Sequence, residues 1–167
     1  QININNKKID FYIVMPSLFI SSPFNNTIFK IINNICFLLN NLYKDCKIVI
    51  RPHYTNKILV EKFFTNSKLF TNIKYDYSSN HNLFFYSKTV ITFNSSMIYE
   101  SYIMQKKTIN ILPKIFNLVR GENVSDSIEI DGLNISENEK VDFFNKLNNP
   151  NKTLKPKIQT DQIFDKI

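Results

Sequence analysis

The stretch TVITFNSSMIYESYIMQKKTINIL, residues 89–112, determines the fold class that this sequence predicts. Two short apolar runs, Thr89–Phe93 and Thr108–Leu112, have the length of buried strands. Between them, the segment Ser95–Gln105 carries its apolar residues at helical spacing. A strand, a helix and a second strand in such close succession are typical of a parallel strand pair joined by a crossover helix.

The same alternation of strand and helix runs through the rest of the chain. The first long helix is expected to begin at Ser22, as its N-cap, with Pro23 at the first helical position. The further expected strands are Phe11–Met15, Lys47–Ile50, Asn72–Tyr75 and Ile128–Ile130, and the further expected helices are Phe24–Tyr43, Thr55–Phe64, Asn82–Ser87 and 136–148, the last with the capping-box pattern Ser136 to Glu139. We therefore predict an α/β fold, a Rossmann-like parallel sheet with helices on both faces.

The length of 167 residues suits one domain and is too short for two full α/β domains. We expect residues 1–10 to be a linker, residues 11–148 to form the domain, and residues 149–167, which are rich in Lys and Pro, to be an extended or disordered tail. Because residue 1 is Gln rather than Met, we expect a longer parent protein.

The positive charge of the chain is a poor guide to its partner. The formal net charge is +7 and the isoelectric point about 9.3, but 19 of the 21 basic residues are lysines scattered along the sequence. The longest basic runs are the pairs Lys7-Lys8 and Lys106-Lys107. The abundance of Lys, Asn and Ile indicates an AT-rich genome, in which codon usage raises the basic charge. We therefore expect no nucleic-acid partner, and a nucleic-acid-binding domain is kept as a rival hypothesis.

Several features that the sequence lacks narrow its class. Cys36 and Cys46 do not have the spacing of a zinc or thioredoxin-type motif, and we expect both to be reduced thiols. No run approaches the ~20 apolar residues of a membrane span, and no signal-peptide pattern is present. No pair of aspartates ends a predicted strand, so no metal site is predicted. The expected location is the cytoplasm, with peripheral association at the inner face of the membrane as an option.

The expected sheet places the carboxyl ends of its strands at one edge, where ligands of such folds bind. The chain has only two glycines, Gly121 and Gly132, so it has no glycine-rich dinucleotide loop and no P-loop. Ser95 and Ser96, with Asn94 before them, stand instead between a predicted strand and a predicted helix. Hydroxyls and free backbone N–H groups at a helix start can hold a phosphate. The alternative is that Asn94 or Ser95 is only an N-cap.

A carboxylate follows the serine pair within the same helix. Glu100 lies four residues after Ser96, on the same helical face and about 6 Å away. It would repel a phosphate at close range but can accept hydrogen bonds from two ribose hydroxyls further along a nucleotide. The alternative is a solvated glutamate on an exposed helix face.

A second group of polar residues follows the strand predicted before Pro52. Arg51 and His53 are two residues apart and point the same way if the chain stays extended. A guanidinium and an imidazole N–H both suit phosphate oxygens. The alternative is that Arg51 pairs with a carboxylate and that His53 is a loop residue. His81, in a polar turn, is expected to be a helix cap or a solvated loop residue.

Together these residues resemble the nucleotide-binding domain of certain GT-B glycosyltransferases, namely the Kdo transferases of capsule synthesis and the bacterial sialyltransferases. Teichoic-acid glycerophosphotransferases share much of the layout. The similar stretches are KIVIRPHYTN, residues 47–56, and LFFYSKTVITFNSSMIYESYIMQKKTINIL, residues 83–112. The first resembles a strand followed by a basic residue and a His-Pro motif. The second is similar to a strand followed by Ser-Ser, Glu-Ala and, before the next strand, Lys-Pro.

The resemblance covers roughly residues 11–148 and implies a single half of a GT-B fold. It implies that His53, Ser95 and Ser96 contact the donor phosphate, with His53 in a catalytic position, and that Glu100 is the glutamate of the family pattern. The sequence departs from that pattern at three places: Tyr54 replaces Pro, Ser101 replaces Ala, and Lys107-Thr108 replaces Lys-Pro. These departures leave the fold prediction intact and count against an active enzyme.

The function implied by the resemblance is that of a donor-binding domain of a glycosyltransferase for capsule or other surface polysaccharide. A CMP- or CDP-activated donor is favoured over a UDP-sugar, and neither a cofactor nor a metal ion is implied. The donor phosphate would be held by Arg51, His53, Asn94, Ser95 and Ser96, and the ribose by Glu100. The general base of these families usually lies on an N-terminal acceptor domain, and we expect that domain to lie outside this sequence. The alternative is a non-catalytic or degenerate Rossmann-like domain that binds a nucleotide or a partner.

Overall fold

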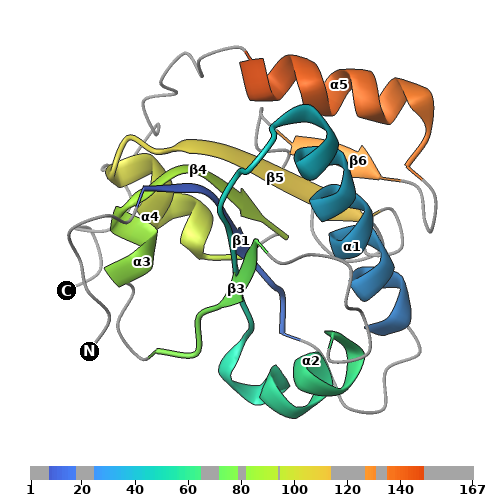
Figure 1. Ribbon diagram of the computed structural model, residues 1–167. Coiled ribbons are helices and arrows are strands. Elements are labelled where there is room, and N and C mark those ends of the chain that lie inside the picture. Colours follow the sequence, from blue (N-terminus) through green and yellow to red (C-terminus); the bar gives the residue numbers. More distant parts are fainter. Residues whose placement is uncertain are drawn as a thin grey trace, which may run out of the picture.

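The computed structural model in Figure 1 describes residues 8–17, 25–64, 72–78, 82–93, 95–113, 127–130 and 135–148. The strands are β1 (Ile9–Val14), β2 (Ile48–Arg51), β3 (Ile73–Tyr75), β4 (Ser87–Thr92), β5 (Lys107–Pro113) and β6 (Ser127–Ile130). The helices are α1 (Asn25–Leu42), α2 (Lys57–Phe64), α3 (Asn82–Phe85), α4 (Met97–Ile103) and α5 (Glu137–Asn148), and a 3-10 turn, η2 (Tyr54–Asn56), precedes α2. None of these helices is long and apolar enough to cross a membrane.

These strands form one parallel sheet in the order β3-β2-β1-β4-β5-β6. The central strand β1 pairs with β2 on one side and with β4 on the other, so that Tyr12 is opposite both Val49 and Val90. All three strands are buried along nearly their whole length, as expected of parallel strands covered on both faces. The order is that of a doubly wound fold, in which the direction of winding changes between β1 and β4. The predicted Rossmann-like α/β fold is confirmed.

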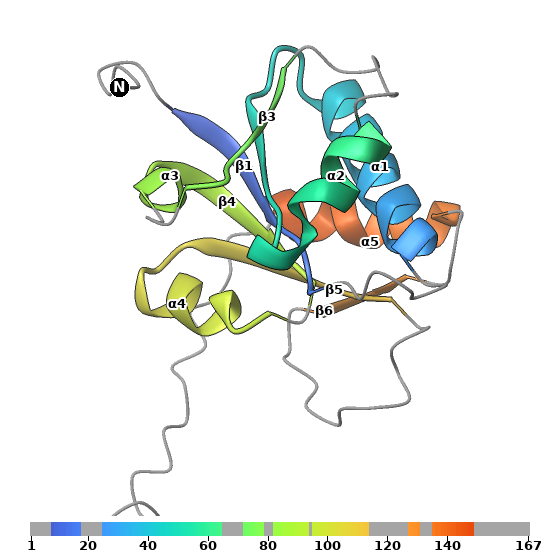
Figure 2. The same cartoon turned by 90° about the horizontal axis from the view of Figure 1, so that it is seen from below.

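The helices form two layers, one on each face of the sheet, as Figure 2 shows. On one face, α1, α2 and α5 pack against alternate strand residues such as Ile13 and Ile50. On the other face, Phe84 of α3 and Met97 of α4 pack against Tyr12 and other strand residues. Successive side chains of a strand point to opposite faces, so residues two apart share a face. Val14 therefore lies on the same face as Tyr12, and Arg51 on the same face as Val49. Arg51 therefore lies on the α3 and α4 face, at the end of β2.

Each boundary predicted for these strands and helices lies within two residues of the observed one. Ser87 was expected at the end of a helix but begins β4, because it pairs with Ile9 at the start of β1. The predicted capping box is present: the Glu139 amide donates to Ser136 Oγ at 3.3 Å, and the Ser136 amide donates to the Glu139 carboxylate at 2.6 Å. The expected helix start at residues 22–23 lies outside the described residues.

Helix α4 ends in a turn that usually requires glycine. Gln105 has a φ of 52°, in the left-handed region that favours glycine. The Lys106 amide donates to the Ser101 carbonyl at 2.8 Å and the Gln105 amide to the Tyr102 carbonyl at 2.9 Å, the hydrogen-bond pattern of a Schellman motif. The turn directs the chain into β5, and its strain is tolerated because the pairing of β5 with β4, which starts at Lys107, fixes the chain on that side.

We expect Gln105→Gly to stabilise the protein by about 1 kcal/mol, because glycine adopts this left-handed conformation without the side-chain clash. The measurement is the free energy of unfolding in urea. Gln105→Ala is the matched control and should not stabilise, since alanine keeps the same clash. Equal effects of the two substitutions would contradict a conformational origin.

Candidate functional site at the carboxyl edge of the sheet

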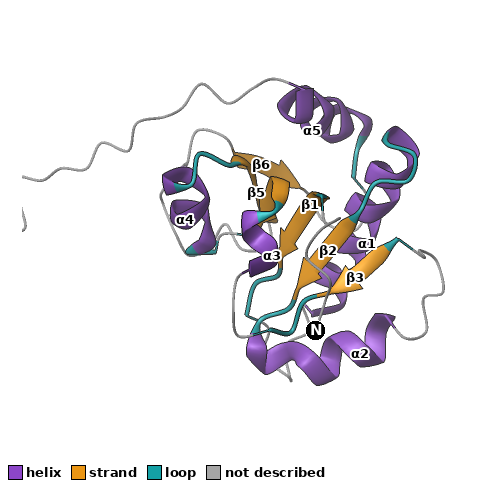
Figure 3. Ribbon diagram, turned by 60° about the vertical axis from the view of Figure 1, so that its left-hand side comes forward, coloured by secondary structure: helices purple, strands orange, loops and turns teal. Residues whose placement is uncertain are grey.

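The carboxyl ends of β1, β2, β3 and β4 lie at one edge of the sheet, as the arrowheads in Figure 3 show for the first three. Arg51 ends β2 and His53 follows it, whereas Ser95 and Ser96 follow β4. Strand β1 lies between β2 and β4, so the two groups are two strand spacings apart, about 10 Å along the edge. A ligand that contacts both groups must therefore extend across the end of β1.

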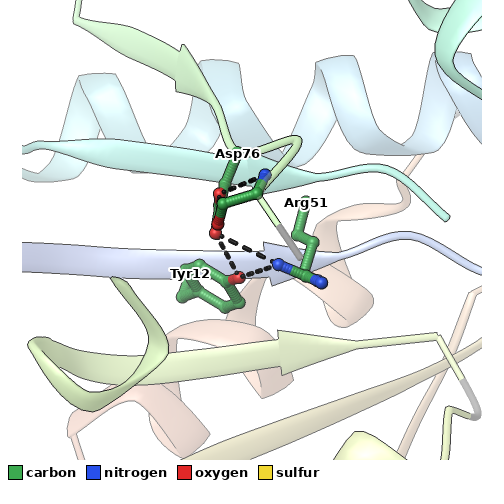
Figure 4. A network of polar contacts seen from close by, with 4 residues as sticks. Tyr12, Arg51 and Asp76 are labelled. Carbon is green, nitrogen blue, oxygen red and sulfur yellow. Dashed lines mark hydrogen bonds and ion pairs between the residues drawn. The ribbon is translucent and has the colours of Figure 1, made fainter. Parts of the chain in front are cut away.

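Three polar side chains from neighbouring strands meet beside this edge (Figure 4). Arg51 Nη1 lies 3.3 Å from Asp76 Oδ2 and 3.5 Å from the hydroxyl oxygen of Tyr12. The Tyr12 hydroxyl donates to Asp76 Oδ2 at 2.9 Å. The side chain of Asp76 is 3% exposed and that of Arg51 is 17% exposed, so this is a largely buried ion pair. Removing one partner of such a pair leaves an uncompensated buried charge, which costs about 3–5 kcal/mol.

Asp76 was not among the site residues that the sequence predicted, and neither was Tyr12. Asp76 follows β3 directly, and its Oδ1 accepts hydrogen bonds from the amide and the hydroxyl of Ser78. The pattern Asp-x-Ser after a strand is the local signal for this turn. Tyr12 stands within an apolar run and gives no such signal, because its ring belongs to the core and only its hydroxyl reaches the network.

Arg51 pairs with a carboxylate, that of Asp76, which was the alternative to phosphate binding in the sequence analysis. This pairing uses Nη1 alone, and among the described residues Nε and Nη2 have no hydrogen-bond partner. Figure 4 shows the second terminal nitrogen pointing away from Asp76 and Tyr12. Pairing with Asp76 and binding of an anion are therefore compatible at Arg51, because they use different N–H groups.

His53 is the N-cap of the turn η2. Its Nδ1 lies 2.8 Å from Thr55 Oγ1 and 3.5 Å from the Thr55 backbone nitrogen. Its ring contacts that of Tyr54 at a tilt of 37°, with the ring centroids 4.4 Å apart. Since Nδ1 is occupied within the turn, Nε2 is the ring atom left for a ligand. Tyr54 is 86% exposed. No hydrogen bond joins His53 to Arg51 in the described part of the chain.

The two serines at the start of α4 differ in what their hydroxyls do. Ser95 Oγ accepts the Met97 amide at 3.3 Å, which is a capping role. Ser96 is exposed and its side chain makes no capping hydrogen bond. Ser96 is thus the serine whose hydroxyl is available at this edge, while Ser95 shapes the turn.

Glu100 lies on the exposed side of α4, and its side chain forms no ion pair with the described residues. Its position one turn after Ser96 is as the helical spacing predicted. Asn94 and His81 lie outside the described residues. No group of three or more His, Cys, Asp or Glu in the described ranges is arranged to hold a metal ion.

Ser101 and Thr108, which the sequence analysis compared with an Ala and a Pro, contact each other beneath α4. Ser101 and Thr108 are both buried, and the Thr108 hydroxyl lies 2.8 Å from Ser101 Oγ. The Ser101 hydroxyl donates to the Ile98 carbonyl at 2.8 Å, so its oxygen can accept from Thr108. This hydrogen-bonded pair joins α4 to β5.

A hollow of about 440 Å³ lies at the opposite, amino edge of the sheet. Its lining includes Asp10 and Lys88, which form an ion pair at 2.5 Å, and Lys44, Asp45 and Cys46 from the turn after α1. The charges in this hollow are mixed and part of them is already paired. It is separated from the candidate site by the length of the strands.

The comparisons with known proteins support the fold and do not assign a family. No family model matches this chain, and no curated protein matches it. Among solved structures, the UDP-GlcNAc 2-epimerase of Methanocaldococcus jannaschii, in complex with UDP-GlcNAc and UDP, is similar with a TM-score of 0.51 and 15% sequence identity. The match covers 84% of this chain and 38% of the epimerase, so the chain spans less than half of that protein. The likeness shows a GT-B-like Rossmann fold.

We expect Ser101→Ala and Thr108→Val each to cost about 1 kcal/mol of stability, because each removes a buried hydrogen bond. The double variant should be less destabilised than the sum of the two, since the second substitution then has no partner to leave unpaired. Urea denaturation of the four proteins measures this coupling. Ser101→Ala combined with Ser136→Ala, on the far face of the sheet, is the control and should be additive.

The pH dependence of stability at alkaline pH should show whether the Tyr12 hydroxyl is buried. Burial raises the pKa of Tyr12 well above its ordinary value, and the negative charge of Asp76 acts in the same direction. The neutral phenol therefore stabilises the fold below pH ~10, and this stability is lost as the pH rises above ~10, where an unfolded tyrosine ionises. Stability measured between pH 8 and 11.5 should fall less steeply in Tyr12→Phe than in the wild-type protein. If stability fell equally steeply with pH in both proteins, the folded state would not raise the pKa of Tyr12.

Proposed function

We propose that the carboxyl edge binds a nucleotide-sugar and that the chain is the donor-binding half of a glycosyltransferase for capsule or other surface polysaccharide. One observation carries this proposal: polar groups after β2 and β4 flank the end of β1, where the winding of the sheet reverses. Doubly wound folds bind their ligands at this place. The likeness to an epimerase solved with UDP-GlcNAc and UDP supports a nucleotide-sugar as the class of ligand.

In the proposed complex the two groups contact different parts of one extended ligand. The free N–H groups of Arg51 and Nε2 of His53 donate to phosphate oxygens at the end of β2. The Ser96 hydroxyl, with Ser95 and Asn94 before it in the chain, contacts the ligand after the end of β4. Glu100, one turn further along α4, accepts from the ribose hydroxyls. A nucleoside diphosphate has the length to cross the ~10 Å between these groups.

The role proposed for His53 and Arg51 in catalysis is electrostatic. When the bond to the sugar breaks, negative charge develops on the leaving phosphate, and donors that already face it stabilise that charge. We assign the general base to an acceptor domain outside this chain. The buried carboxylate near the edge, Asp76, does not suit that role because both of its oxygens are engaged.

The same engagement of Asp76 favours a second candidate, a domain that binds a nucleotide or a partner without turnover. The replacement of the motif proline by Tyr54 points in the same direction. Incubation of the chain with radiolabelled CMP-, CDP- and UDP-sugars distinguishes the two candidates. Transfer to an acceptor or hydrolysis of the donor by this chain alone would exclude the non-catalytic one. Association with the inner face of a membrane belongs to the first candidate and is tested by co-sedimentation with anionic vesicles.

The first test of the proposal is thermal stabilisation by CMP, CDP, UDP and GDP. A nucleotide present at 100 times its dissociation constant should stabilise the protein by about 2.7 kcal/mol. Ser96→Ala and the Ser95→Ala/Ser96→Ala double variant should lose most of this shift. Stabilisation by cytidine nucleotides would favour a CMP- or CDP-activated donor, whereas stabilisation by UDP would favour a donor like that of the epimerase.

Ser136→Ala is the matched control, because Ser136 also caps a helix but follows β6, which lies three strands away from β1 in the sheet. Ser95→Ala alone separates capping from binding, since Ser95 has the capping bond and Ser96 does not. Ser95→Ala should lower the melting temperature without ligand, and Ser96→Ala should not. If no nucleotide stabilises the wild-type chain, the proposed binding function of the isolated chain is wrong.

A further inference from the structure

Asp76 has no capacity left for a ligand. A carboxylate offers about four acceptor positions, two on each oxygen. Oδ1 accepts from the amide and the hydroxyl of Ser78, and Oδ2 accepts from the hydroxyl of Tyr12 and from Arg51 Nη1. All four positions are filled by groups of the protein itself. A buried carboxylate in this state fixes the groups around it and does not bind substrate.

Arg51 is in the opposite state. Of its three nitrogens, Nη1 alone donates to Asp76 and Tyr12. The N–H groups on Nε and Nη2 have no partner among the described residues, although the side chain is only 17% exposed. Nε and Nη2 lie on the same edge of the planar guanidinium, and their N–H bonds run parallel. That edge matches two oxygens of one phosphate group.

We propose that Tyr12 and Asp76 are positioning residues that hold Arg51 by Nη1, so that its Nε and Nη2 edge binds two oxygens of a nucleotide phosphate at the carboxyl edge. This proposal rests on the proposed function and deepens it. It names a terminal or bridging phosphate with two accessible oxygens as the group that Arg51 recognises. It also assigns a role to Tyr12, whose hydroxyl joins the two charged partners and thereby restricts the rotation of the guanidinium.

The register of the sheet supports a rigid arrangement. Tyr12 lies in the centre of β1, with its ring edge-on to Phe84 at 6.0 Å between centroids, so its hydroxyl cannot move far. The Asp76 amide donates to the Ile50 carbonyl at 2.9 Å, which ties the residue after β3 to β2. Both partners of Arg51 are therefore fixed by backbone pairing or core packing before any ligand binds. Such preorganisation lowers the entropy that binding must overcome.

Three variants test the proposal by titration calorimetry with the nucleotide that stabilises the wild-type chain most and with its nucleoside. Arg51→Lys keeps the charge but loses the paired donors, and should weaken nucleotide binding about tenfold. Tyr12→Phe keeps the ring and removes only the hydroxyl, and should weaken nucleotide binding by a factor of about 3–10. Asp76→Asn should behave like Tyr12→Phe. Nucleoside binding, which involves no phosphate, should be unchanged in all three.

The matched controls are Tyr43→Phe and Asp10→Asn, which remove a tyrosine hydroxyl and a paired carboxylate at the amino edge. Both should bind the nucleotide like the wild-type protein. A second readout needs no ligand: NMR relaxation of the ¹⁵N-labelled Arg51 Nε–H should show a rigid group in the wild type and a mobile one in Tyr12→Phe. This measurement also shows whether each variant is folded.

Three outcomes would overturn the proposal. In the first, the wild type binds nucleotide and Tyr12→Phe and Asp76→Asn bind as tightly as the controls. In the second, nucleoside and nucleotide lose affinity equally, which indicates general damage to the fold. In the third, the Arg51 Nε–H is equally mobile in the wild type and in Tyr12→Phe. Failure of the proposed function is recognised separately, because in that case the wild-type protein itself binds no nucleotide, and the phosphate-binding role of Arg51 fails with it.

Discussion

The parallel pairing of β1 with both β2 and β4 is the constraint on which the candidate site depends. It brings the end of β2, with Arg51 and His53, to the same edge as the turn after β4, although more than 40 residues separate them. It also places Tyr12 on the face that Arg51 shares, because paired residues of parallel strands point the same way. If β1 were displaced by one residue, Tyr12 would point to the other core and the network with Arg51 and Asp76 would be lost.

The fold could be predicted from the sequence because its strands are buried on both faces. Such strands are short apolar runs, and those at 89–93 and 108–112 stand out against the polar segment between them. The observed boundaries differ from the predicted ones where pairing with a distant strand determines the structure. Ser87, for example, belongs to β4 because it pairs with Ile9. The shortened helix α4 has a similar cause, since the left-handed Gln105 and the sheet register of Lys107 end it early.

The candidate site could be predicted only in part, because sequence patterns report neighbours along the chain. Arg51, His53, Ser95 and Ser96 could be placed at the carboxyl edge, because each stands at or just after the end of a recognisable strand. The partner of Arg51 could not be identified, because Asp76 lies 25 residues away and Tyr12 lies 64 residues from Asp76. The contact between Ser101 and Thr108 was hidden for the same reason. In the sequence they are two separate departures from a family pattern, and in the structure they are one hydrogen-bonded pair.

The pairing of Arg51 also changes how the positive charge of the chain should be interpreted. A protein that binds a polyanion presents several cations whose charge is unneutralised, and its affinity comes from the counterions that they displace. At this edge the guanidinium is already neutralised by Asp76. Any attraction for a phosphate must then come from the direction of the remaining N–H groups and not from net charge. Directed donors select a ligand by shape and require a fixed geometry, which a buried Tyr12–Arg51–Asp76 network supplies and a scattered set of surface lysines does not. The arrangement therefore suits a small phosphorylated ligand better than a nucleic acid.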